Sequence, residues 1–591
     1  MYLHRTQRRK NGKDHEYWSI VESRRLANGR VVQRHVLYLG EINDAQERAW
    51  ARSIEVLTDD HPTPQTMALF PEDRVPAVVD DASIVRLKLG ALSVHRPRQW
   101  GACWLALQLW KELRLDQFWV QRLPAGRKGT RWDQVLAVLT AYRLIAPGSE
   151  WRLHRQWFDN SAMADLLGAD FSLADPHKLY GCHDLLLAHK AALFSHLTQR
   201  WRDLFNVSFD VLLYDLTSTY FECDPPVEEQ DKRKFGYSRD KRPDCVQVVI
   251  ALIVTPEGFP LAYDVLSGNT PDKTTLRQFL QKIEAQYGKA RRVWVMDRGI
   301  PTEEVLAEMR ASDPPVQYLV GTPKGRLSKL EKDLLDKPWR QARAGVDVKL
   351  LAQEGELYVL ARSRDRVAKE RAMRRKQLKR LWKRLRQLQG MRLCSKDLLM
   401  KLGAARQQSP SAWRLVAVEV DAIAATFTYR LRKDKLRQTR RREGRYLLRS
   451  NLMETDPAVV WSYYLQLVEV EQAFRTLKGD LAIRPIFHQD QRRIEAHLFV
   501  SFLAYCLHVT LGRWLRDLAP GLTSRSVLEK FAGVQMVDVH IPTTDGRTLL
   551  LQRYTHPEAE LRLLLERLKL QLPAQPPPRI TVAPVQTGAS M

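Results

Sequence analysis

The chain lacks three features that would fix its class at once. It has no run of about 18 apolar residues, so we expect no membrane span. Its first 13 residues are basic and contain no apolar segment, so we expect no secretory signal. The six cysteines are far apart and form no Cys-x2-Cys pair, which disfavours a zinc ribbon and a disulfide scaffold. These absences predict a cytoplasmic protein with reduced thiols.

Acidic residues are too few to balance the basic ones. The 591 residues include 94 Lys and Arg but only 68 Asp and Glu, which gives a net charge of +26. The usual partner of such a surplus is a polyanion, most often nucleic acid. Ribosome-associated and membrane-surface proteins share this balance, so charge alone leaves the partner open. With 44% hydrophobic residues, the length suggests several folded domains.

The N-terminal half begins with a strand pattern and then becomes helical. Residues 17–23 and 31–38 are rich in β-formers and flank Asn28-Gly29, which predicts a basic β-hairpin. Residues 46–98, with prolines at 62, 64, 71 and 76, are expected to form a linker with short elements. From residue 100 to 206 the apolar residues recur at helical spacing.

The next section alternates strands and helices. Short turns join its first three strands, and helices separate the later ones, so an antiparallel meander with added parallel strands is expected. This order is typical of a ribonuclease-H-like mixed sheet within an α/β protein. The expected strands are 211–214, 246–255, 259–266, 293–296 and 316–320, and the expected helices are 271–287 and 303–311.

A basic segment at 322–450 interrupts this pattern. Residues 362–386 hold thirteen Lys and Arg against two acids, with leucines at helical spacing, which predicts a basic amphipathic helix. Residues 430–449 hold ten Lys and Arg against two acids, between β-rich stretches. Each run alone could be a solvated face. Two in one module favour contact with phosphates.

Helical periodicity returns at 458–478, 494–515 and 559–570, and the Pro-rich end is expected to be disordered. The expected division is a β-hairpin at 1–45, a linker at 46–98, a helical domain at 99–206, the core at 207–321, a β-rich and helical basic insertion domain at 322–450, the rest of the core at 451–520, a helical region at 521–572 and a disordered tail at 573–591.

Two aspartates share a context that suggests metal chemistry. Asp215 and Asp297 each follow a short apolar strand and precede a polar or glycine-containing turn. Carboxylates at neighbouring strand ends could hold a hard cation such as Mg²⁺, which prefers oxygen ligands. The alternative is that both are turn-forming or helix-capping acids.

A third acid is expected on the helix at 458–478. Tyr464, Glu471 and Lys478 are seven residues apart, so they share one helical stripe, and Arg475 flanks it. The alternative is an exposed helix with intrahelical ion pairs. Glu469 lies about 200° around the helix from Glu471, so both cannot face one site.

These residues resemble a known family. Asp215, Asp297 and Glu471 look like the DDE triad of transposases from bacterial insertion sequences, and the helix resembles the Tyr-x2-Arg-x3-Glu-x6-Lys signature of the insertion-sequence-four superfamily. Leu467 stands at the signature Arg position, a departure that Arg475 could offset from the next turn. Three further stretches of sequence, at 236–244, 268–274 and 487–498, also resemble this family.

The resemblance implies a ribonuclease-H-like core with an insertion before the Glu helix, and cleavage and strand transfer at transposon ends. It implies that Asp215, Asp297 and Glu471 hold two Mg²⁺ ions, with Mn²⁺ as a substitute. Tyr464, Arg475, Lys478 and Arg298 would contact DNA. The expected partners are double-stranded inverted-repeat ends and target DNA, bound by a homodimer associated with the nucleoid.

Three other interpretations stay open. A decayed relative would bind transposon ends without cutting them. Another ribonuclease-H-like nuclease, for example one that resolves junctions, would lack inverted repeats around its gene. An RNA-binding translation factor, supported only by the charge, would need neither Asp215 nor Glu471.

Overall fold

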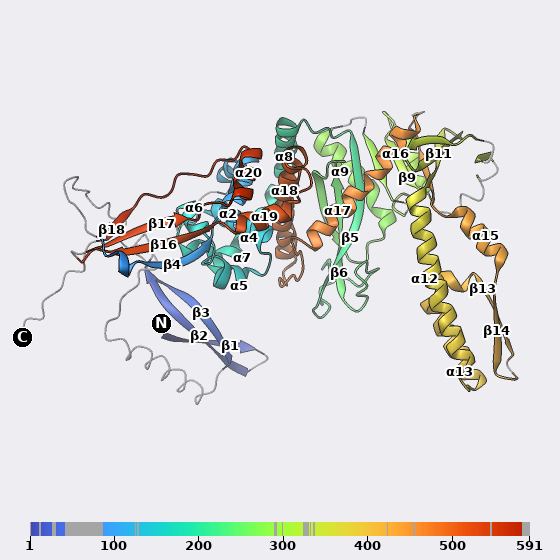
Figure 1. Ribbon diagram of the computed structural model, residues 1–591, viewed down its shortest axis with the longest axis horizontal. Helices are drawn as coiled ribbons and strands as arrows, with labels where there is room; N and C mark the ends of the chain where they lie inside the picture. Colours follow the sequence, from blue (N-terminus) through green and yellow to red (C-terminus); the bar gives the residue numbers. More distant parts are fainter. Residues whose placement is uncertain are drawn as a thin grey trace, which may run out of the picture.

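The computed structural model describes residues 2–10, 13–25, 31–41 and 87–581. Short gaps inside the last range fall at 124–125, 127–128, 289–291, 298, 323–329, 331–332, 335–336, 422, 453–455 and 544–545. The molecule is elongated (Figure 1), with a helical region in the middle, a large sheet beside it and a helical projection at one end.

The N-terminal segment forms an antiparallel sheet of three strands. These are β1 (Tyr2–Lys10), β2 (Lys13–Arg25) and β3 (Val31–Glu41). The predicted hairpin corresponds to β2 and β3, and β1 is an additional strand. The predicted Asn28-Gly29 turn lies outside the described residues.

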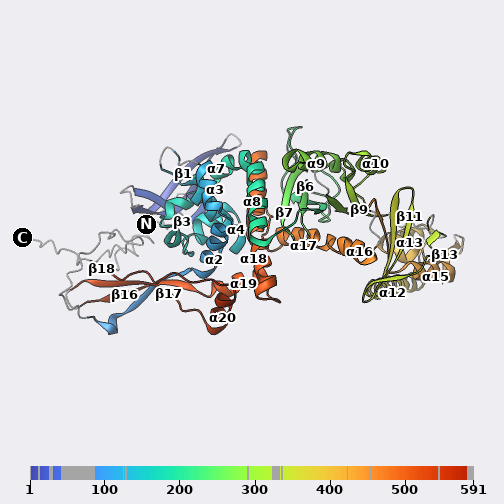
Figure 2. The same ribbon diagram turned by 90° about the horizontal axis from the view of Figure 1, so that it is seen from above.

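Helices pack around one long central helix in the middle region. The central helix is α18 (Gln491–Leu518), which contacts α4 (Trp132–Ile145) and α7 (Pro176–Leu186). It is apolar on nearly all sides, as a helix surrounded by protein must be. By length and composition α18 could cross a membrane, but 89% of its apolar window is buried inside the protein. Figure 2 shows α18 beside α8 (Lys190–Phe205), where the helical region meets the sheet.

The central sheet has nine strands in the order β10-β11-β12-β15-β9-β8-β5-β6-β7. β5, β6 and β7 form the predicted antiparallel meander, and β8 and β9 add in parallel to β5. Their bounds are β5 (Val211–Phe221), β6 (Val246–Val254), β7 (Pro260–Ser267), β8 (Val293–Met296) and β9 (Gln317–Gly321). Helices α9 (Asp272–Tyr287) and α10 (Glu303–Ala311) connect them.

The expected insertion is only partly separate from this sheet. β15 (Arg445–Ser450) pairs with both β9 and β12 (Glu356–Ser363), so the first and last strands of the segment extend the core sheet. The sequence pattern missed this because strand pairing between distant segments has no local signature. β10 (Arg340–Arg343) and β11 (Val346–Gln353) complete that edge.

The remainder of the insertion projects from the sheet. It contains the basic helix α12 (Arg364–Gln389), α13 (Ser395–Gln408), α14 (Pro410–Trp413), the hairpin of β13 (Val416–Asp421) and β14 (Thr426–Leu431), and α15 (Lys433–Arg442). Leu381, Leu385 and Leu388 of α12 are buried in a small core of its own. The opposite face of α12 carries its exposed cations.

Two expectations about the C-terminal end of the chain are wrong. The region expected to be helical contains the strands β16 (Gln535–Pro542) and β17 (Thr548–Tyr554) between α19 (Ser524–Ala532) and α20 (Ala559–Arg567). β16 pairs with β4 (Ser93–Gln99), a short element at the end of the expected linker. The tail expected to be disordered contains β18 (Arg579–Thr581), which pairs with β17. Residues 582–591 lie outside the described residues.

Candidate active site

Parallel pairing of β5 and β8 places Asp215 beside Asp297. The register pairs Val211 with Val293 and runs to Tyr214 with Met296, so the next step brings the two aspartates side by side. Neighbouring residues in register point to the same face of a sheet. The Tyr214 hydroxyl donates to Thr275 of α9 at 2.7 Å, so Asp215 faces the opposite side.

Asp215 does not end its strand as predicted. β5 continues to Phe221, and Asp215 lies near its middle, paired with Leu252 of β6. The polar stretch after Asp215 resembled a turn, but its threonines are β-formers and Ser218 is buried. The Ser218 hydroxyl accepts the backbone N–H of Arg239 at 3.3 Å, which satisfies its polarity within the fold.

Glu471 comes to this face on α17 (Leu467–Lys478). This helix packs against β5 and β6, on the side that Asp215 faces. The Glu471 side chain is exposed, whereas Val470 and Phe474 are buried against the core. Buried and exposed residues recur along α17 at helical spacing, so α17 presents a polar face to solvent at the site.

The predicted single helix is two helices that meet at Gln466. The first, α16 (Pro457–Leu465), carries Tyr464, and the second carries Glu471 and Lys478. The Tyr464 ring lies 5.5 Å from the rings of Tyr446 and Trp461. It therefore packs where β15 meets α16.

The pKa of Asp215 is affected by the charges of the other two carboxylates. The pKa of Asp215 is raised to about 7, mainly by burial and also by the negative charges of Asp297 and Glu471. A backbone N–H and the positive charge of Arg239 oppose this rise. Three acids thus act on one another at the same face of the sheet, where a cation would stabilise all of them.

A loop rich in cations borders the carboxylates. Lys478 Nζ lies 2.9 Å from Asp240 Oδ1, and Arg484 contacts the other oxygen of Asp240 at 3.2 Å. Burial lowers the pKa of Lys478, although its hydrogen bond to Asp240 opposes this shift. Arg239 donates to Asp272, at the start of α9, at 2.6 Å. The loop therefore contacts β5, the start of α9 and the end of α17.

The other candidate residues are placed as follows. Arg475 is exposed on α17 and donates to Gln472 at 3.1 Å. Arg298 lies outside the described residues. Glu469 is half-buried, and burial raises its pKa, with Arg516 and Glu257 as its charged neighbours. Glu469 thus interacts with Arg516 and Glu257, whereas the charge of Glu471 acts on Asp215.

The sequence patterns assigned no role to Arg239, Asp240 and Arg484. The signal was present, because Arg239 and Asp240 lie in the stretch 236–244 that resembles the family. The contact of Asp240 with Lys478 could not be predicted from sequence, because the two residues are more than 230 positions apart.

Comparison with known families agrees with this arrangement. The family described as transposase DDE domain matches residues 210–507, just over half of the 591 residues. The chain belongs to the DDE transposase family. The matched region runs from the start of β5 into α18 and contains all three carboxylates. The transposase also matches the family described as IS1634 family transposase, N-terminal domain, at residues 3–61.

Similarity to individual proteins is slight. No curated protein matches the transposase. A solved structure of the piggyBac transposase synaptic complex with hairpin DNA is similar with a TM-score of 0.34 and 9% identity, over 76% of this chain and 82% of that chain. The family assignment therefore rests on the family matches. As a DDE transposase, the protein is an enzyme of DNA transposition that cuts DNA and transfers strands, and it depends on divalent metal.

Proposed function

We propose that Asp215, Asp297 and Glu471 form the catalytic centre of this transposase, on a ribonuclease-H-like core. The observation that carries the proposal is the convergence of three negative charges on one face of the sheet. Two acids occupy adjacent register positions, and the third lies on the helix that covers that face. The core would comprise 207–321 and 451–520, with 322–450 inserted between them.

These side chains fit divalent magnesium, because carboxylate oxygens are its preferred protein ligands. When bound, two Mg²⁺ ions would activate the attacking oxygen and stabilise the leaving oxygen of phosphoryl transfer. Asp215 would contribute to holding both ions, and Asp297 and Glu471 would each contribute to holding one of them. Lys478 would hold a DNA phosphate as a point charge after leaving Asp240.

Removal of divalent metal should abolish cleavage while leaving DNA binding. We expect no product from end-containing DNA after chelation, with full recovery on adding Mg²⁺ or Mn²⁺, since the carboxylates alone cannot neutralise a phosphate. Gel analysis of cleavage and anisotropy of binding would check both parts. Cleavage at an unchanged rate in chelator would contradict the proposal.

Lys478→Gln should weaken contact with the DNA backbone. Losing one phosphate contact should lower the slope of log affinity against log salt by about one. Titrations at several salt concentrations would measure this. Arg525→Gln is the matched control, because Arg525 pairs with Glu529 on α19 and its slope should not change. An unchanged slope for Lys478→Gln would remove Lys478 from the DNA interface.

The projecting part of the insertion is a second candidate DNA surface. Four exposed cations, Lys376, Lys379, Lys383 and Arg386, lie on α12 opposite its buried leucines. Cations along one helix face can neutralise several phosphates, and each such contact adds to the salt-dependent affinity.

Changing these four residues to Gln should reduce DNA affinity at least tenfold at moderate salt, since each phosphate contact adds to the salt-dependent term. The control changes four exposed cations elsewhere to Gln, namely Arg516, Arg562, Arg567 and Lys569, which alters net charge equally. Equal losses in both variants would show that only net charge matters.

Pairing two transposon ends would require two copies of the chain, so we propose a homodimer in the end-paired complex. Action on DNA would place the protein in the cytoplasm, at the nucleoid. Sedimentation of the protein with and without end DNA would test the assembly.

A further inference from the structure

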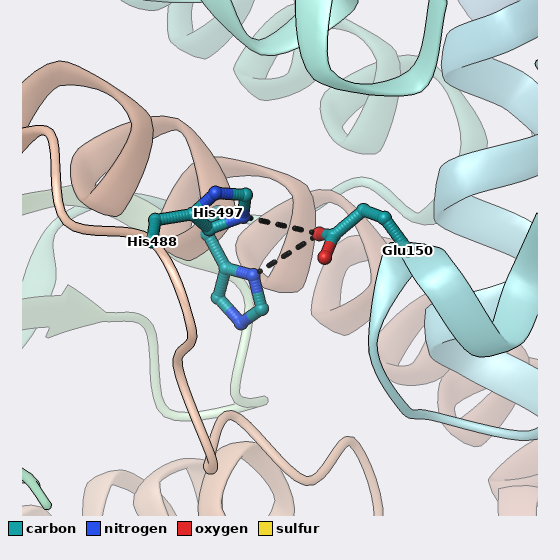
Figure 3. A group of neighbouring side chains, drawn as sticks. All are labelled: Glu150, His488 and His497. Atoms are coloured by element: carbon teal, nitrogen blue, oxygen red, sulfur yellow. Dashed lines mark hydrogen bonds and ion pairs between the residues drawn. The ribbon is translucent and has the colours of Figure 1, made fainter. Parts of the chain in front are cut away.

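A buried carboxylate meets three imidazoles within the helical region, two of which are drawn in Figure 3. Glu150 begins the short helix α5 (Glu150–Arg152), His488 precedes α18, and His497 lies on its second turn. Glu150 Oε1 lies 3.3 Å from His488 Nε2 and 3.4 Å from His497 Nδ1. His183 of α7 is the third imidazole, with Nε2 at 3.2 Å from the same oxygen. All four residues are at least 93% buried.

The contacts of His497 leave one nitrogen without a suitable partner. Its Nε2 lies 3.3 Å from the carbonyl oxygen of Ile483, which can only accept a hydrogen bond. If Nε2–H donates there, a neutral ring has a lone pair on Nδ1, aimed at the Glu150 oxygen. Nδ1 has no hydrogen-bond partner among the described residues. The other neutral tautomer would instead set a lone pair against the carbonyl.

His497 is 2% exposed, and its Nδ1 lies 3.4 Å from Glu150 Oε1. In the tautomer that donates Nε2–H to Ile483, the Nδ1 lone pair faces that oxygen. A neutral imidazole lone pair therefore faces a carboxylate oxygen. Two electron pairs in this position are stabilised by a cation between them.

The separations are those of ligand atoms around a small metal ion. Tetrahedral sites with bonds of about 2.0–2.1 Å place neighbouring ligand atoms roughly 3.3 Å apart. The corresponding distances here are 3.3 and 3.4 Å, longer than the usual N–H···O length of about 2.9 Å. The three candidate ligand atoms all lie within 4.8 Å of one another.

The surroundings include the outer partners that such sites use. A ligating histidine commonly donates its second N–H to a carbonyl, as His497 does to Ile483. His183 can donate Nε2–H to Glu150 and so orient the carboxylate. The charge of Arg143 opposes a dication, but its Nη atoms donate to the carbonyls of Ala482 and Gly148.

We propose that Glu150, His488 and His497 bind one zinc-like transition-metal ion, separate from the catalytic carboxylates. Two imidazoles and a carboxylate suit Zn²⁺ and related ions better than Mg²⁺. The ion joins α5 to the segment that follows the Glu471 helix and to α18. Its role is to fasten residues 479–490, which connect α17 to the helical region.

The test measures metal in untagged protein, because an affinity tag of histidines would itself bind zinc. We expect about one zinc per chain after dialysis against metal-free buffer. Stripping with a strong chelator should lower the melting temperature by roughly 5 °C or more, with recovery on adding Zn²⁺. Co²⁺ added to stripped protein should give the visible absorption of a low-coordinate site.

Variants distinguish this site from the catalytic one. His488→Gln, His497→Gln and the nearly isosteric Glu150→Gln should each lower zinc content at least tenfold. His508→Gln, in the same helix as His497, and Glu471→Gln should retain it. Zinc that persists in all three cluster variants, or unmodified protein that neither contains zinc nor gains stability or a Co²⁺ spectrum, would overturn the proposal and leave the cluster a hydrogen-bond network.

Discussion

Asp215→Asn and Glu471→Gln should each reduce the rate of DNA cleavage about a thousandfold or more, which corresponds to a loss of about 4 kcal/mol of transition-state stabilisation. Both changes keep the size of the side chain and remove one negative charge from the face where the three acids meet. Binding of end DNA should persist or increase, because less negative charge then faces the phosphates. Single-turnover cleavage, with binding measured in parallel, would check the expectation.

Glu469→Gln is the matched control for Glu471→Gln. Both residues lie on α17, but the charged neighbours of Glu469 are Arg516 and Glu257. We expect cleavage by Glu469→Gln to stay within a few-fold of the unmodified rate. If Glu469→Gln were inactive and Glu471→Gln active, the catalytic acid would have been assigned to the wrong face of the helix.

Glu356→Ala should destabilise the sheet where the insertion joins the core. Glu356 of β12 is 5% exposed and accepts a hydrogen bond from Arg310 at 2.6 Å and others from Arg449 and Tyr318. These partners lie on three other elements, α10, β15 and β9. Removing the carboxylate leaves a buried Arg449 without that partner, which typically costs about 3–5 kcal/mol of unfolding free energy.

Urea denaturation followed by tryptophan fluorescence would measure this loss. Glu419→Ala is the control, because the Glu419–Arg430 pair is exposed on the hairpin of the insertion and should contribute less than about 1 kcal/mol. Similar midpoints for the two variants would show that the Glu356 network does not join the insertion to the core.

Local pattern predicted the central elements well. The strands and helices between 211 and 321 were expected within a few residues of their observed bounds, because each has a strong apolar period. The exception was β5, whose continuation past Asp215 contains hydroxyl side chains that read as a turn. These hydroxyl groups form tertiary hydrogen bonds, such as that between Ser218 and Arg239, which cannot be recognised from the sequence.

Long-range pairing was harder to predict. Joining of β15 to β9 and of β4 to β16 depends on segments that are far apart in the chain. The break at Gln466 was also missed, since every residue around it is compatible with a helix. For the site, the apolar strands before Asp215 and Asp297 and the helical spacing around Glu471 led to the choice of the three carboxylates. The contact of the loop carrying Arg239 and Asp240 with Lys478 depends on the fold.

The most direct test of a DDE transposase built on Asp215, Asp297 and Glu471 uses a DNA fragment that contains this protein's own gene and its flanks. The fragment would be incubated with purified protein and Mg²⁺, beside an Asp297→Ala variant, and every break would be mapped. We predict paired breaks at inverted repeats on both sides of the gene, absent with the variant. Binding without breaks in both Mg²⁺ and Mn²⁺, or breaks that persist with Asp297→Ala, would contradict the assignment.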